Sequence, residues 1–187
     1  MLTLCKDGYV YTHTDDRMWR KTRNTETPGV CEGVDTNRNW DANWSGPGAS
    51  NRPCSDTYYG VSAFSEVETK YGADELRNVV PHAFADVHAY SQYWMFPYGY
   101  KAQKAENYDE LMDMSKEIVD AISSVHRTKF VYGPINEVNS LFGKYGVKKI
   151  FKVIYVASGG SIDWVYDAVG TPCCYAPELR DTVSQNK

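Results

Sequence analysis

The sequence predicts an α/β fold, because segments with the pattern of β-strands alternate with segments that have helical periodicity. With 187 residues, of which 42% are hydrophobic, the chain is long enough to bury one ordinary core. We therefore expect a single domain over residues 1–187, without internal repeats or low-complexity tracts. In open α/β sheets, functional sites gather at the carboxyl ends of strands.

The N-terminal half predicts one short strand, one long loop and one helix. Residues 9–11 (YVY) have strand composition, and residues 24–59 form a polar stretch with many turn formers. Loops of that length are usually functional or disordered. Ser65 and Glu68 have the spacing of a capping box, which predicts a helix from there to about residue 80. The apolar residues expected to face inward on this helix are Val67, Tyr71, Leu76 and Val79.

The C-terminal half predicts three strands and two helical segments. Residues 83–87 form an apolar strand interrupted by Asp86, with His88 at its end. Residues 108–125 form the clearest helix, and residues 162–167 could form a helical turn. Residues 130–132 and 153–156 have strand composition. The apolar stripe expected to face the core from the long helix consists of Leu111, Met114, Ile118, Ala121, Ile122 and Val125.

Charge and hydropathy exclude two classes of partner. The formal net charge of -4 argues against nucleic acid, which requires a dense basic surface. No apolar run approaches the roughly 20 residues needed to cross a bilayer, and the first residues are too short for a signal peptide. We expect a protein that binds neither nucleic acid nor membrane.

The five cysteines leave at least one thiol unpaired. Cys31 and Cys54 bracket a loop rich in Asn, Gly, Ser and Pro, where a disulfide would restrict the unfolded chain most. Such a disulfide would imply an oxidising compartment, and two buried free thiols are the alternative. Asn43-Trp44-Ser45 is an N-glycosylation sequon, which is consistent with secretion.

Four segments carry the side chains that could do chemistry. They are residues 35–40 (DTNRNW), 84–92 (FADVHAYSQ) followed by 97–100 (PYGY), 157–164 (ASGGSIDW) and 178–182 (ELRDT). In the first, Asn37 and Arg38 together offer an amide donor and a planar guanidinium, which suit a carboxylate ligand. A solvated surface pair is the alternative for an isolated Asn-Arg dipeptide.

In this order, the four segments resemble the zinc metallocarboxypeptidases of the carboxypeptidase A family. The resemblance implies a mixed β-sheet flanked by helices and an enzyme that hydrolyses the C-terminal peptide bond of peptides and proteins. It implies zinc as the cofactor, peptide or protein C-termini as partners and secretion, and we expect a monomer.

The resemblance also assigns the chemistry of hydrolysis. It implies that Asn37 and Arg38 bind the terminal carboxylate and that His88 is a zinc ligand. Glu178 becomes the general base that takes a proton from the metal-bound water and delivers it to the leaving amine. Arg20 matches the arginine that polarises the scissile carbonyl and stabilises the oxyanion.

Four further positions match the substrate cleft of the family. Arg17 matches a basic residue of the groove, Tyr90 a cleft tyrosine and Tyr155 the mobile tyrosine that closes over substrate. Ile162 matches the base of the specificity pocket, where an apolar side chain favours aromatic or aliphatic C-terminal residues. We therefore expect A-type specificity. Ordinary core or surface packing is the alternative for Tyr90 and Tyr155.

The sequence departs from the family in its metal ligands and its extent. None of the four histidines begins the His-x-x-Glu motif that supplies two of the three family ligands. The match runs from about residue 7 to 182 and excludes the final helix, which predicts a partial catalytic domain. Residues 136–153 have the character of an insertion, either a surface loop or the product of an altered gene structure. A non-catalytic module that binds peptide C-termini and a chain that never folds stably are the competing hypotheses.

Overall fold

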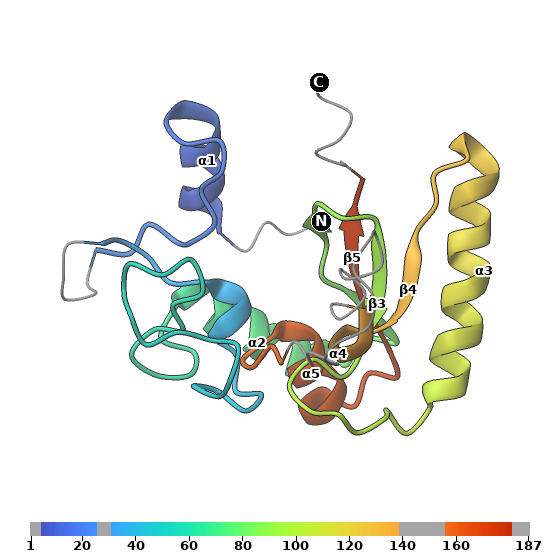
Figure 1. The fold of residues 1–187 in the computed structure, drawn as a ribbon. Coiled ribbons are helices and arrows are strands. Elements are labelled where there is room, and N and C mark those ends of the chain that lie inside the picture. Colours follow the sequence, from blue (N-terminus) through green and yellow to red (C-terminus); the bar gives the residue numbers. More distant parts are fainter. Residues whose placement is uncertain (1–4, 26–30, 139–155, 181–187) are drawn as a thin grey trace, which may run out of the picture.

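The computed structural model describes residues 5–25, 31–138 and 156–180, and within them one mixed sheet forms the centre of the fold (Figure 1). Its strands run in the order β1-β5-β3-β4, and β2 also pairs with β5. The strands are β1 (Ala83–Ala85), β2 (His88–Ala89), β3 (Tyr93–Phe96), β4 (Val131–Pro134) and β5 (Cys173–Leu179). β5 is parallel to β1 and β2 but antiparallel to β3, whereas β3 and β4 are parallel. The expected mixed sheet is confirmed.

Helices cover the sheet on both faces. The described helical segments are α1 (Lys6–Thr14), η1 (Thr36–Arg38), α2 (Val67–Val79), α3 (Tyr108–His126), α4 (Ile135–Val138), α5 (Ser161–Trp164) and the π-helical η3 (Val165–Val169). Figure 1 shows α3 on one side of the strands and α2 and α5 toward the other, with α1 standing apart.

Alternation along the strands creates a hydrophobic core on each face. In β3, Met95 belongs to the core under α2 and α5, while the next residue, Phe96, belongs to the core under α3. In β5, Cys174 and Tyr175 divide in the same way. Because successive side chains of a strand point to opposite faces, the two buried faces account for the near-continuous apolar composition of these strands.

The structure corrects the predicted N-terminal strand. Residues 9–11 lie within helix α1. Tyr11 packs edge-on against Trp19 with 5.1 Å between ring centroids, and the guanidinium of Arg23 lies 3.9 Å from the Tyr11 ring centroid. These tertiary contacts override the local strand propensity of a Tyr-Val-Tyr run.

Helix α2 is present, but its cap and buried face differ from the prediction. Glu66 is the N-cap residue, and no side chain makes a capping hydrogen bond. The buried residues are Thr69 and Ala73, whereas Val67, Tyr71 and Val79 are more than 60% exposed. Small side chains face the core here because they permit close packing, a preference that hydrophobic periodicity does not detect.

The prediction for α3 was correct in extent but wrong for part of its buried face. Leu111 is fully buried as expected, and the other buried residues are Ser115 and Val119. Met114 and Val125 are 41% and 70% exposed. The Ser115 hydroxyl donates to the Leu111 carbonyl at 2.6 Å, which allows a polar residue to be buried on the inner face.

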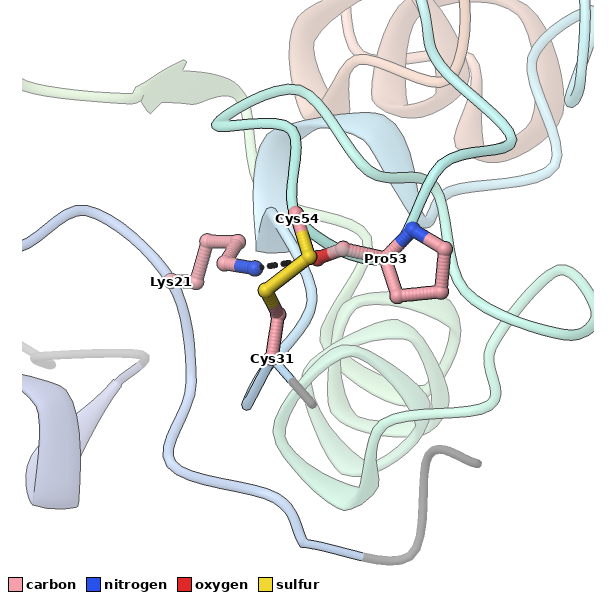
Figure 2. Close-up of a disulfide and its surroundings, with 4 residues drawn as sticks. All are labelled: Lys21, Cys31, Pro53 and Cys54. Atoms are coloured by element: carbon pink, nitrogen blue, oxygen red, sulfur yellow. Dashed lines mark hydrogen bonds between the residues drawn. A yellow bond between two sulfur atoms is a disulfide. The ribbon is translucent and has the colours of Figure 1, made fainter. Parts of the chain in front are cut away.

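A disulfide between Cys31 and Cys54 fastens the long loop that precedes α2 (Figure 2). Beside it, the Lys21 ammonium donates to the Pro53 carbonyl at 2.6 Å. Burial lowers the pKa of Lys21. Because Lys21 follows Arg20 directly, these links hold the Arg20 segment against the loop. The disulfide expected from the sequence is therefore present.

Two expectations fall on residues that the structure does not describe. The strand predicted for residues 153–156 lies outside the described part except for Val156, which is not in a strand, and most of the supposed insertion at 136–153 also lies outside it. Among the described residues, no helix is long and apolar enough to span a membrane.

Candidate active site

The sheet brings His88 and Glu178 together. His88 begins β2, Glu178 lies near the end of β5, and the two are paired in the parallel register of these strands. Directly paired residues on neighbouring strands project from the same face of a sheet, with backbones about 5 Å apart. The imidazole and the carboxyl predicted as metal ligand and general base are therefore neighbours, although they are distant in the sequence.

Glu178 lies in a partly buried, electrostatically mixed environment. Burial raises the pKa of its carboxyl, while the charges of His88 and Arg20 act in the opposite direction. A raised pKa favours the protonated form of a carboxyl, which a group needs in order to return a proton after acting as a base. The position of Glu178 is compatible with the role of general base that the sequence assigned to it.

The Nε2 atom of His88 lies between an acid and an amide. It is 2.9 Å from Asp86 Oδ2 and 3.0 Å from Asn37 Nδ2. Burial opposes the charged forms of both ionisable groups. Their mutual attraction nevertheless raises the pKa of His88 and lowers the pKa of Asp86. Nε2 donates to Asp86 when it carries a proton and accepts from Asn37 when it does not, so either state has a partner on this side of the ring.

Ser161, the first residue of α5, links this cluster to that helix. Its hydroxyl donates to Asp86 Oδ2 at 2.5 Å, and its backbone N–H donates to Asn37 Oδ1 at 2.9 Å. The second bond orients the Asn37 side chain so that its NH2 group points to His88. Residues from η1, the β1–β2 connection and α5 therefore meet at one point.

Asp35 orients the other predicted side chains of the site. Its Oδ1 accepts from the backbone N–H of Asn37 at 3.0 Å, and its Oδ2 accepts from Arg20 Nε at 2.9 Å. Asp35 is 2% exposed, whereas the side chain of Arg20 is 39% exposed. The negative charge of Asp35 raises the pKa of Arg20, to which Glu178 contributes less. Asp35 therefore anchors the guanidinium at one edge, and the charge of Glu178 also raises the pKa of Arg20.

Arg38 is buried, and hydrogen bonds to backbone carbonyls orient its side chain. Its Nε donates to the Gly48 carbonyl at 3.0 Å, and its NH1 donates to the Asn37 carbonyl at 2.7 Å. Gly159 packs directly on the Arg38 backbone, where any side chain would collide. A fixed guanidinium is the group that best presents two parallel hydrogen bonds to a carboxylate.

The remaining predicted residues are less closely joined to this cluster. Ile162 is 3% exposed and belongs to the core next to Trp40 and Trp164. Tyr90 is 42% exposed, and Arg17 is exposed on the segment after α1. Tyr155 lies outside the described residues. The structure therefore groups Arg20, Asn37, His88 and Glu178, with Arg38 next to Asn37.

The described residues do not by themselves fit a catalytic zinc. Such a site usually has three protein ligands and one open position. Within residues 5–25, 31–138 and 156–180, no group of three His, Cys, Asp or Glu side chains could hold a metal ion. His88 is the single ligand expected from the sequence, in agreement with the missing His-x-x-Glu motif.

Sequence reasoning missed three residues that organise the site: Asp35, Asp86 and Ser161. Asp86 could have been found, because an acid within an apolar strand requires a buried partner. Ser161 gave no such signal, since its partners Asp86 and Asn37 are remote in sequence. Asp35 could have been recognised in part, because an acid at a helix N-cap accepts from a backbone N–H of the first turn, but its bond to Arg20 joins residues that are 15 apart.

Comparison with known proteins shows similarity to zinc carboxypeptidases in sequence and in fold. The zinc carboxypeptidase family matches residues 1–186. The chain is 46% identical to mouse carboxypeptidase A2 over 177 residues and 44% identical to bovine carboxypeptidase B, in each case covering 94% of the chain and 39% of the relative. The structure of bovine thrombin-activatable fibrinolysis inhibitor with tick carboxypeptidase inhibitor superposes with a TM-score of 0.85 at 36% identity, covering 97% of the chain and 57% of that protein. The chain thus spans about two fifths of the length of these two curated relatives.

Proposed function

The chain belongs to the zinc carboxypeptidase family. We propose that it is part of a metallocarboxypeptidase that removes the C-terminal residue of peptides and proteins. The observation that carries the proposal is the pairing of His88 with Glu178 beside Asn37. His88 is a residue type that binds metals, Glu178 can transfer a proton, and the Asn37 amide can bind a carboxylate. We also propose that residues 1–187 form part of a larger catalytic domain.

Binding of the terminal carboxylate is assigned to Asn37 and Arg38. The amide is oriented by Ser161, and the guanidinium is held by the Gly48 carbonyl. A pre-oriented amide and guanidinium lose little conformational freedom when an anion arrives, so each hydrogen bond contributes more to binding. This arrangement would select a free C-terminus over an amidated one.

Glu178 and Arg20 are assigned to the bond that breaks. Glu178 exchanges a proton with the reacting groups, and Arg20 donates to the scissile carbonyl oxygen as negative charge develops on it. Anchoring of Arg20 by Asp35 leaves part of its exposed guanidinium available to substrate. The raised pKa of Glu178 favours proton return to the leaving amine.

We further propose A-type specificity, with apolar or aromatic C-terminal residues preferred. Ile162 supports this, because a buried aliphatic side chain adds no charge that would attract a basic terminal residue. The relatives bear both A and B names, so the family match alone does not choose between these preferences.

We propose that the protein is secreted and monomeric. The Cys31–Cys54 disulfide supports secretion, because such bonds persist in oxidising compartments. The tick carboxypeptidase inhibitor bound to the fibrinolysis-inhibitor relative supports peptide and protein ligands as partners.

One observation favours a second candidate, a non-catalytic module that binds peptide C-termini. His88 Nε2 is engaged by Asp86 and Asn37, and no group of three potential ligands occurs among the described residues. Such a module would use Asn37 and Arg38 in the same way but would not hydrolyse the bound peptide.

Zinc analysis combined with a peptidase assay separates the candidates. Because His88 is the single zinc ligand expected in residues 1–187, the larger catalytic domain that contains them would be incubated with zinc, desalted, analysed for metal and assayed with hippuryl-Phe and hippuryl-Arg, with Glu178→Gln as the control. The enzyme proposal predicts bound zinc, faster release of Phe, and a loss of about 10²-fold or more in Glu178→Gln. Peptide binding without turnover supports the module, faster release of Arg defeats the specificity proposal, and neither binding nor turnover rejects both functions.

A further inference from the structure

The sequon Asn43-Trp44-Ser45 has no part in the proposed chemistry, yet its asparagine is tied into the fold. Asn43 is an exposed residue with φ of 53°, in the left-handed region. Its Nδ2 nevertheless donates to the hydroxyl of Ser158 at 3.1 Å, and Ser158 is completely buried. A Cβ atom at Gly46 would lie 2.6 Å from the Ser158 hydroxyl and would collide with Asn43 Nδ2. The amide nitrogen of the sequon therefore occupies a confined position.

Two backbone hydrogen bonds fasten the same turn to the same partner segment. The Gly159 N–H donates to the Ala42 carbonyl at 2.8 Å, and the Ser158 N–H donates to the Pro47 carbonyl at 3.2 Å. With the bond from Asn43, residues 42–47 are joined to Ser158 and Gly159 at three points. Asn43 supplies the side-chain contact among these three.

Both sides of this junction touch Arg38. The Gly48 carbonyl, at the end of the turn, accepts from Arg38 Nε at 3.0 Å. On the other side, Gly159 packs on the Arg38 carbonyl so closely that no side chain could be accommodated there. The turn and the Ser158–Gly159 segment thus fix the guanidinium and the backbone of the same residue.

We propose that Asn43 is a positioning residue for Arg38, and that its sequon must stay unmodified in molecules that recognise peptide C-termini. The inference rests on the proposed function, because Arg38 is the assigned carboxylate-binding group. A glycan would replace one hydrogen of Asn43 Nδ2 and add a bulky group to a nitrogen that already lies close to Gly46 and Ser158. The turn would separate from Ser158, and the Gly48 carbonyl would no longer hold Arg38 in place.

The test compares Asn43→Ala with Ser45→Ala in the complete chain. Both substitutions destroy the sequon, but Ser45→Ala keeps the Asn43 amide. Affinity for benzoyl-Gly-Phe and for the same peptide with a C-terminal amide would be measured with chelator present, so that no hydrolysis occurs. We expect Asn43→Ala to lower the preference for the free acid by about 5-fold, the equivalent of one hydrogen bond, and Ser45→Ala to leave it unchanged. Equal weakening for both peptides would show a purely structural role, and an unchanged preference would also overturn the proposal.

A wild-type chain without any preference for the free acid would reject the proposed carboxylate site itself. In that case, hydrogen exchange of the Ser158 and Gly159 amides still tests whether Asn43 holds the junction. Faster exchange is expected in Asn43→Ala but not in Ser45→Ala, and identical rates would overturn the structural part of the inference. Secretion from eukaryotic cells adds a second readout by intact mass. The folded fraction that prefers the free acid should carry no glycan at Asn43, and a glycosylated fraction with the same preference would contradict the inference.

Discussion

Replacing Asn39 by alanine should destabilise the loop that carries Asn37 and Arg38. The Asn39 side chain is fully buried immediately after η1. Its Nδ2 lies 2.9 Å from the Tyr59 carbonyl, 3.0 Å from the Ser62 carbonyl and 2.9 Å from the Ser65 hydroxyl. The two amide protons are therefore shared among three acceptors.

The amide oxygen of Asn39 makes a second connection, to the start of α2. It accepts from the Glu66 backbone N–H at 3.1 Å and from the Thr69 hydroxyl at 2.7 Å. Two donated and two accepted bonds, at about 1 kcal/mol net each, give a loss of about 4 kcal/mol in the free energy of unfolding for Asn39→Ala. The loss in the free energy of unfolding should stay near this value even if the segment relaxes, because the buried partners of Asn39 would be left without hydrogen bonds.

Urea denaturation monitored by tryptophan fluorescence measures this loss. With an m value of about 2 kcal/mol per M urea, the midpoint should fall by about 2 M. Asn78→Ala is the matched control, because Asn78 is exposed near the end of α2 and should shift stability by no more than about 0.5 kcal/mol. If Asn39→Ala moved the midpoint no further than Asn78→Ala, the assigned role of the Asn39 network would be refuted.

Three further predictions concern the disulfide, a buried acid and the free thiols. Replacing Cys31 and Cys54 by serine should cost about 3 kcal/mol of stability, because the bond closes a loop with a sequence separation of 23 residues; thermal unfolding with and without reductant measures this. Burial raises the pKa of Asp163 to about 7 in the folded chain, against an ordinary value of 3.8. The folded state therefore holds this proton more tightly, and stability should decline by about 4 kcal/mol as pH rises from about 4 to 7, a slope that Asp163→Asn should flatten. Burial also raises the pKa of Cys5 and of Cys174 to about 12, so both thiols should resist iodoacetamide at pH 7.5 in the folded chain, as mass spectrometry can show.

Each of these predictions has a clear contrary outcome. Equal stability of oxidised and reduced chains would contradict the assigned effect of the disulfide. Identical pH slopes for the wild type and Asp163→Asn would show that another group governs the acid range. Rapid alkylation of Cys174 without denaturant would mean that the core around β5 opens more readily than its complete burial implies.

The sequence predicted the fold class and the long helix α3 because their signals are local. Strand and helix composition alternates along the chain, and Leu111 lies on a stripe with clear helical spacing. The strand predicted at residues 9–11 was wrong, since ring contacts and a cation near Tyr11 stabilise a helix there. Those contacts join residues that no short window considers together.

The candidate site shows the same division between local and non-local information. The residue motifs identified Asn37, His88 and Glu178, and the fold places them together. Asp86 and Ser161 were not recognised, because their importance comes from a hydrogen bond that joins two distant segments. A sequence pattern specifies which groups a site contains, whereas the partners that orient those groups depend on chain topology.

The most direct test of the central claim is a crystal structure of the chain with a bound peptide that ends in phenylalanine. We expect the terminal carboxylate to contact Asn37 and Arg38 and the last peptide carbonyl to lie near Arg20 and Glu178. A carboxylate bound elsewhere, or a peptide whose last bond lies far from Glu178, would contradict it.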